Sequence, residues 1–195
     1  MKHFIMSCAT VVLVCACAST PQEPVSSGRW DEDAIKTVCE TLINSALTSP
    51  NINQFINDYV QQNGGRNPTV IVGSFKNDTS EHINTDMISS KMETAIINTG
   101  RLEFVAGGDL REELRAERQD QQYNASEDSA AGLGKEEAAV FMLNGSVRSE
   151  VTRSGNTTRS FYVVTAVLTN IEDNKKVWQD ESEIQRTATQ AKNKF

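Results

Sequence analysis

Few residues of this chain could do chemistry. It has four cysteines and two histidines, and its carboxylates include the adjacent pairs Glu112-Glu113 and Glu136-Glu137. Neighbouring residues on a helix point apart, so we do not expect either pair to share a proton as catalytic carboxylates do. The chain has no Gly-x-Ser-x-Gly turn and no glycine-rich phosphate loop with its lysine. The sequence therefore predicts a protein that is not an enzyme and holds no cofactor or metal.

The best chemical candidate is Cys17. A basic start, an apolar stretch from Phe4 to Val14 and a small residue, Ala16, precede it, as in a secretory signal. The apolar stretch is about ten residues, half of the ~20 that a transmembrane helix needs. The segment resembles the bacterial lipoprotein signal, in which a branched apolar residue stands three before the modified cysteine and a small residue stands directly before it. The alternative is an ordinary secretory signal with a chance cysteine.

The resemblance to a lipoprotein signal predicts that residues 1–16 are removed and that Cys17 carries lipid, which anchors the protein in a membrane. Ser19 replaces the aspartate that typically retains such proteins at the inner membrane, so the resemblance implies delivery to the outer membrane. Cys39 would then be the remaining thiol, expected to be buried on a helix. His82 is expected at the surface. One thiol and one histidine support neither a disulfide framework nor a multi-ligand metal site.

Composition and local patterns divide the chain into a lipidated tether and a folded part. A formal net charge of −7 argues against a general binder of nucleic acid or anionic lipid. Residues 17–29 are small, polar and proline-bearing, which predicts a flexible tether that reaches at most about 40 Å. In residues 30–66 apolar side chains recur at helical spacing, which predicts two amphipathic helices.

Residues 67–195 alternate predicted helices and strands and end in a three-stranded meander. The predicted strands are 68–75, 102–105, 140–147, 160–168 and 176–180. The predicted helices are 85–99, 109–118, with Leu110 and Leu114 facing inward, and the short segment 135–139. Residues 119–129 have almost no apolar content, which predicts a mobile loop. The order indicates one α/β domain with a mixed sheet flanked by helices.

Three stretches together resemble the LpoB family of outer-membrane lipoproteins. They are Val70-Ile71-Val72 through Phe75-Lys76-Asn77-Asp78-Thr79, Ala95 through Val105, and Lys135 through Ser146, with Lys176-Val177-Trp178 as the closing strand. The resemblance covers about residues 68–183. It implies a fold like the amino-terminal domain of TolB and a protein that binds and activates a class A penicillin-binding protein, a peptidoglycan synthase.

No binding residue of the family can be carried over to this chain. The loop from Gln119 to Gly134 and the hairpin from Arg148 to Arg159 are the expected partner-binding surfaces, because exposed loops commonly carry binding function. Within the hairpin, the candidate contacts are Arg148, Arg153 and Arg159. We expect a monomer anchored by Cys17 and facing the periplasm. The alternatives are a structural or assembly lipoprotein of a secretion or flagellar ring, and a small-ligand binder or hydrolase.

Overall fold

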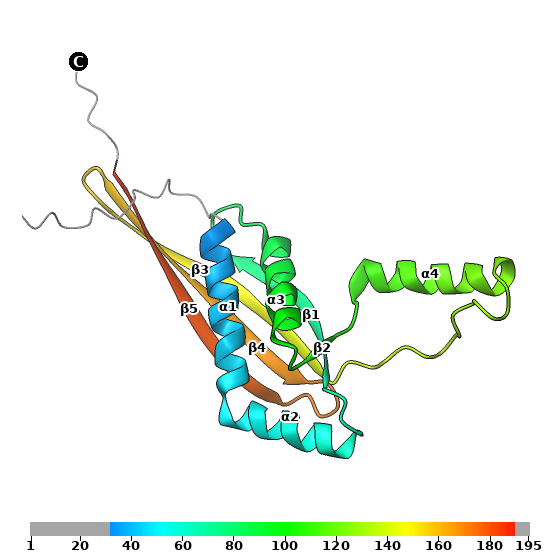
Figure 1. The fold of residues 1–195 in the computed structure, drawn as a ribbon. Helices are drawn as coiled ribbons and strands as arrows, with labels where there is room; N and C mark the ends of the chain where they lie inside the picture. The colour runs from blue at the N-terminus through cyan, green and yellow to red at the C-terminus, as the bar shows by residue number, and fades with distance from the viewer. Residues whose placement is uncertain (1–31, 190–195) are drawn as a thin grey trace, which may run out of the picture.

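The computed structural model describes residues 32–189, and the predicted signal sequence, Cys17 and tether lie outside this range. Five strands form one sheet in the spatial order β2-β1-β3-β4-β5 (Figure 1). Their bounds are β1 (Thr69–Asp78), β2 (Glu103–Phe104), β3 (Phe141–Ser154), β4 (Thr157–Asn170) and β5 (Lys176–Thr189). β1 pairs in parallel with β2 and β3, whereas β3, β4 and β5 pair antiparallel. The predicted mixed α/β fold is confirmed.

Four helices accompany the sheet: α1 (Glu32–Thr48), α2 (Pro50–Gln62), α3 (Thr85–Thr99) and α4 (Gly108–Asn124). α1 and α3 pack side by side on one face of the sheet, while α2 lies across its lower end (Figure 1). The start of α3 is fixed by Asn84, whose side chain accepts hydrogen bonds from the backbone N–H groups of Asp86 and Met87. Gly100 ends the helix with a left-handed backbone at φ 63°.

The core lies between α1, α3 and the sheet face that they cover. Phe141, Val147 and Val164 of the strands are fully buried, and they meet Leu42 of α1 and Ile88 of α3 in one hydrophobic cluster. α1 falls in the predicted extension 30–66, and it shares this core with the strands. Cys39 is buried, as predicted, and burial raises the pKa of its thiol to about 12.

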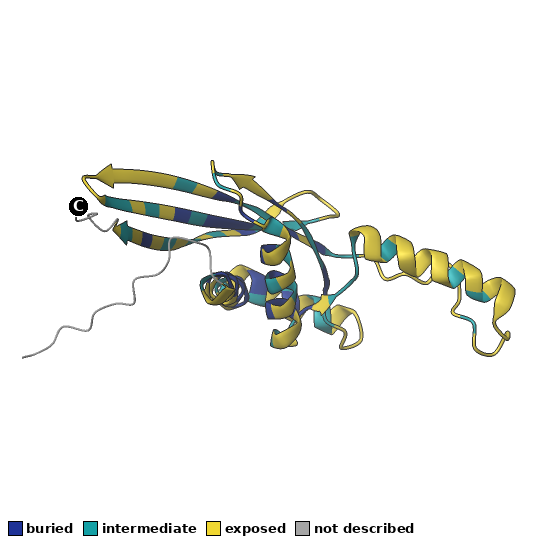
Figure 2. Cartoon of the chain, turned by 90° about the horizontal axis from the view of Figure 1, so that it is seen from above, coloured by how far each residue is buried: buried dark blue, intermediate teal, exposed yellow. Residues whose placement is uncertain are grey.

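The opposite face of the sheet carries no helix over β3, β4 and β5, and we call it the open face. Register assigns residues to it: Arg148 of β3 lies beside Val163 of β4, which lies beside Glu183 of β5. Tyr162 and Val164, their neighbours on β4, point to the helix-covered face and are buried. The strands also run past the end of the helix layer, where most of their residues are exposed (Figure 2). We call this projecting part, residues 149–162 with 184–189, the ribbon.

The structure corrects three predictions about the connection between β2 and β3. α4 begins at Gly108 and continues to Asn124, through half of the predicted loop. Leu110 and Leu114 do not face inward, because α4 stands away from the sheet and none of its residues is buried (Figure 1). Residues 135–139 form no helix and approach β3 as an irregular segment.

Candidate protein-binding surfaces

The three predicted contact arginines lie on the long hairpin of β3 and β4, but not on one face. Arg148 and Arg159 lie on the open face, because each alternates along its strand with residues that point toward the helices. Arg153 pairs with Thr158 on the helix side of the ribbon. All three side chains are exposed. Any one flat partner can therefore contact Arg148 and Arg159 together, but reaches Arg153 only by wrapping around the ribbon.

Arg148 belongs to a network that crosses three strands. Its Nη2 donates to Glu181 Oε1 at 2.8 Å and to Thr165 Oγ1 at 3.1 Å, and Thr165 Oγ1 donates to Glu181 Oε1 at 3.0 Å. Thr165 is consequently buried although it lies on the open face. Since the Arg148–Glu181 pair is exposed, it contributes little stability but holds the guanidinium in a fixed position.

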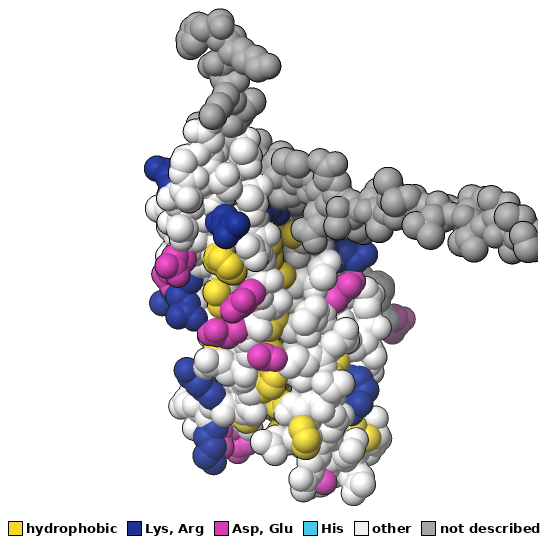
Figure 3. Space-filling view, turned by 90° about the vertical axis from the view of Figure 1, so that its left-hand side faces the viewer, with side chains coloured by type: hydrophobic (Ala, Val, Ile, Leu, Met, Phe, Trp, Pro, Cys, Tyr) yellow, Lys and Arg dark blue, Asp and Glu magenta, His cyan; other side chains and the backbone are white. Residues whose placement is uncertain are grey.

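An apolar stripe runs along β4 through the middle of the open face. Phe161 is 39% exposed, Val163 and Val167 are partly exposed, and Met142 of β3 is 36% exposed near the end of the stripe. Polar and charged residues of β3 and β5 flank it. In the space-filling view of the side on which β5 lies, hydrophobic side chains form rows between acidic and basic ones (Figure 3). An apolar centre with a charged rim is the usual anatomy of a protein-binding surface.

Sequence reasoning missed this stripe because Ser160 to Leu168 reads as one continuous apolar run, and a run without alternation does not show which face is covered. The neighbouring strand β5 does show which face is solvated. Glu181, Glu183 and Gln185 recur at every second position of β5, which marks one face of that strand as solvated.

The second predicted surface, residues 119–134, is part of an arm that projects from the other end of the molecule (Figure 1). The irregular return segment is bonded to α4. Arg115 Nε and Arg118 Nη2 donate to Glu136 Oε1 at 2.9 and 2.8 Å, and Gln122 Nε2 donates to the carbonyl of Ala131. The arginines hold the pKa of the Glu136 carboxyl below its usual range, chiefly through the hydrogen bonds from Arg115. The structure therefore does not bring the two predicted surfaces together.

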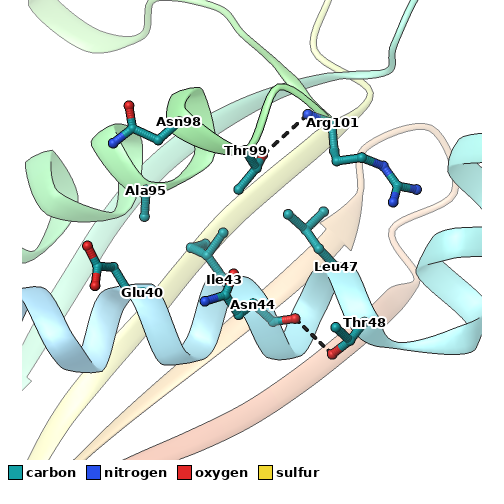
Figure 4. Close-up of a pocket in the computed structure, with 9 residues that line it drawn as sticks. All are labelled: Glu40, Ile43, Asn44, Leu47, Thr48, Ala95, Asn98, Thr99 and Arg101. Atoms are coloured by element: carbon teal, nitrogen blue, oxygen red, sulfur yellow. Dashed lines mark hydrogen bonds between the residues drawn. The ribbon is translucent and has the colours of Figure 1, made fainter.

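A cavity of about 480 Å³ lies between α1 and α3 (Figure 4). Its floor is apolar, with Ile43, Leu47 and Ala95, and Asn44 and Thr99 are among its polar lining residues. Thr99 Oγ1 donates to the carbonyl of Ile96 and accepts the backbone N–H of Arg101. The Thr99 hydroxyl is therefore engaged within the protein, and the cavity lies at the junction of two helices.

The described part of the chain holds no group of three or more metal-ligating side chains. Within residues 32–189, no helix is both long and apolar enough to cross a bilayer. His82 is exposed at the surface, as predicted.

The sequence match to a known family covers most of these elements. The family described as peptidoglycan-synthase activator LpoB matches residues 34–184, well over half of the chain, from α1 into β5. The chain belongs to the LpoB family. The match confirms the predicted resemblance and gives the chain the family's general role as an activator of a peptidoglycan synthase, a regulatory rather than an enzymatic role. No curated protein matches the chain in sequence.

Solved structures of similar fold include LpoB domains. The LpoB C-terminal domain from Salmonella enterica is 14% identical with a TM-score of 0.45, and the match covers 80% of this chain and 100% of that domain. The corresponding Escherichia coli domain is 14% identical with a TM-score of 0.44, and the match covers 77% of this chain and 97% of that domain. The lipoprotein GNA1162 from Neisseria meningitidis is 14% identical with a TM-score of 0.42, and the match covers 65% of this chain and 88% of that protein.

Proposed function

We propose that this protein is an outer-membrane lipoprotein that binds a class A penicillin-binding protein and raises its synthetic activity, without being an enzyme itself. The observation that carries the proposal is the family match over residues 34–184. The lipoprotein-like signal before Cys17 supports an anchor in the outer membrane, facing the periplasm. One chain, as a monomer, binds one synthase.

The open face is the proposed contact surface. Its apolar stripe is uncovered, and Arg148 and Arg159 border it within reach of one partner. Arg153 adds a contact where the partner wraps around the ribbon. Activation then follows from a difference in affinity: a protein that binds the active state of the synthase more tightly than its idle state shifts the population toward the active state.

The tether limits where this contact takes place. Residues 17–29 span at most about 40 Å when fully extended. The synthase region that is recognised must therefore lie within that distance, plus the length of the folded domain, from the membrane that holds Cys17. We propose a contact on a part of the synthase that extends toward the outer membrane.

The test is the glycan polymerisation rate of a purified class A penicillin-binding protein with and without the full chain in detergent. We expect the chain to raise the rate, and the Arg148→Ala and Arg159→Ala variants each to need about fivefold more protein for the same effect, equivalent to about 1 kcal/mol of binding. Arg66→Ala is the matched control, since Arg66 is an exposed arginine at the opposite end of the molecule. An unchanged rate with the wild-type chain would contradict the proposal.

A further inference from the structure

A second cavity lies on the helix side of the ribbon, on the face opposite Arg159. It encloses about 400 Å³ between the three long strands and the loop that follows β1. Register sets its floor in two rows. Val151, Ser160 and Arg186 form one row, and Arg153, Thr158 and Ala188 form the next. Each row takes one residue from each strand, so the floor is as rigid as the sheet.

The cavity is lined by more positive than negative charge. Arg186 is only 5% exposed, although a guanidinium keeps its charge in any environment. Arg153 adds a second guanidinium from the exposed rim. Glu81 is the one carboxylate among the described residues that line the cavity, and both its oxygens lie 2.8 Å from the Tyr162 hydroxyl, which donates to it. The lining therefore carries two positive charges against one negative charge.

The lining is also rich in hydrogen-bond donors. Guanidinium groups present planar forks that match a carboxylate or phosphate, and the hydroxyls of Thr158 and Ser160 add donors that can rotate toward a ligand. Glu81 would repel a doubly charged phosphate more strongly than a singly charged carboxylate. Val151 and Ala188 supply apolar contact beside the charged groups. These features favour a carboxylate attached to a short carbon chain.

We propose that this cavity binds the carboxylate of an acidic peptide segment. Arg153 and Arg186 hold the carboxylate, and Val151 and Ala188 contact the methylene groups that carry it. A volume of about 400 Å³ accommodates a side chain together with part of its backbone. The site lies on the other face of the ribbon from Arg159 and shares only Arg153 with the proposed synthase contact, so it stands whether or not a synthase is the partner.

The decisive probe is the acetylated and amidated tripeptide Ala-Glu-Ala, with Ala-Gln-Ala as the uncharged control and inorganic phosphate as a third ligand. The arginine Nε–Hε signals of the full chain in detergent are followed by NMR during each titration. We expect the signals of Arg153 and Arg186 to shift and saturate with the glutamate peptide, and the signal of Arg159 to stay in place.

Substitutions separate the site from general charge attraction. Arg153→Gln should weaken binding of the glutamate peptide at least fivefold, and Arg159→Gln should leave it unchanged, because these two exposed arginines lie on opposite faces of one hairpin. Arg153 lies on the rim, so its loss should not unfold the protein. Arg186→Lys keeps the buried charge but removes the fork, and should also weaken binding.

Three results would overturn the proposal. One is equal binding of the glutamine and glutamate peptides. Another is unchanged binding by a folded Arg153→Gln variant. The third is tighter binding of inorganic phosphate than of the glutamate peptide, which would assign the cavity to a different class of ligand.

Discussion

The two faces of the central sheet differ in what covers them. On one face the helices leave Phe141 fully buried, and on the other Phe161 stays 39% exposed. Along β5 the alternation of polar residues already marks the open face. Along β4 both faces carry apolar side chains, so which of them is buried depends on where the helices pack. The covered face holds the hydrophobic core of the domain, and we propose that the open face is left free for a partner.

The largest test of this comparison is a matched pair of phenylalanines. Phe141→Ala should lower the free energy of unfolding by about 3–5 kcal/mol, because the ring is fully buried and packs 4.8 Å from the ring of Phe55. Phe161→Ala should lower it by no more than about 1 kcal/mol, since the ring is already partly in water. Urea unfolding followed by circular dichroism measures both. Equal losses would mean that the open face is also structural.

The second pair compares a leucine of the core with a leucine of the arm. Leu42→Ala in α1 should cost about 2–5 kcal/mol of stability, because Leu42 is 1% exposed. Leu114→Ala in α4 should change stability by about 0.5 kcal/mol or less, because α4 buries none of its residues. The same urea titration compares them. A large loss for Leu114→Ala would indicate that α4 packs against the body in solution.

A smaller effect concerns the contact between α1 and β5 on the covered face. Ser45 Oγ donates to Asp180 Oδ2 at 2.5 Å, and this bond is the main cause that holds the pKa of the Asp180 carboxyl below its ordinary range. A lowered pKa in the folded state stabilises the protein above the unfolded pKa of about 3.9, and this contribution disappears as pH falls through the folded value.

Melting temperatures of wild type and Ser45→Ala should therefore differ at neutral pH and converge as the solution is acidified below about pH 4. Thr48→Ala is the control on the same helix, since Thr48 Oγ1 bonds only to backbone carbonyls. Its difference from wild type should not change with pH. A Ser45→Ala difference that persists at low pH would show that the Asp180 charge is not its source.

Sequence patterns predicted the helices of the covered face well. Apolar spacing predicted the helix on which Cys39 is buried. The helix predicted over residues 85–99 has the bounds of α3, because its ends at Asn84 and Gly100 depend on neighbouring residues alone. The prediction that Leu110 and Leu114 of the arm face inward was wrong, because it concerned packing between distant parts of the chain. Leu110 and Leu114 have the same spacing as core leucines, and spacing does not tell whether a helix packs on its own sheet.

The candidate sites were predicted only in part. Exposure of Arg148, Arg153 and Arg159 followed from their polar hairpin, but their division between two faces depends on strand register, which the turn at Gly155 and Asn156 sets. The cavity around Arg186 was missed because β5 was predicted to end at Asp180. The polar residues that follow continue the strand only because β4 pairs with them as far as Thr189.

The most direct test of the open face as the partner-binding surface is oxidative footprinting of two methionines. Met142 on the open face and Met87 on α3 are similarly exposed, at 36% and 39%. When the full chain binds a class A penicillin-binding protein, we expect oxidation of Met142 and Phe161 to fall severalfold and oxidation of Met87 to stay constant. Protection of Met87 with Met142 unchanged would contradict the account.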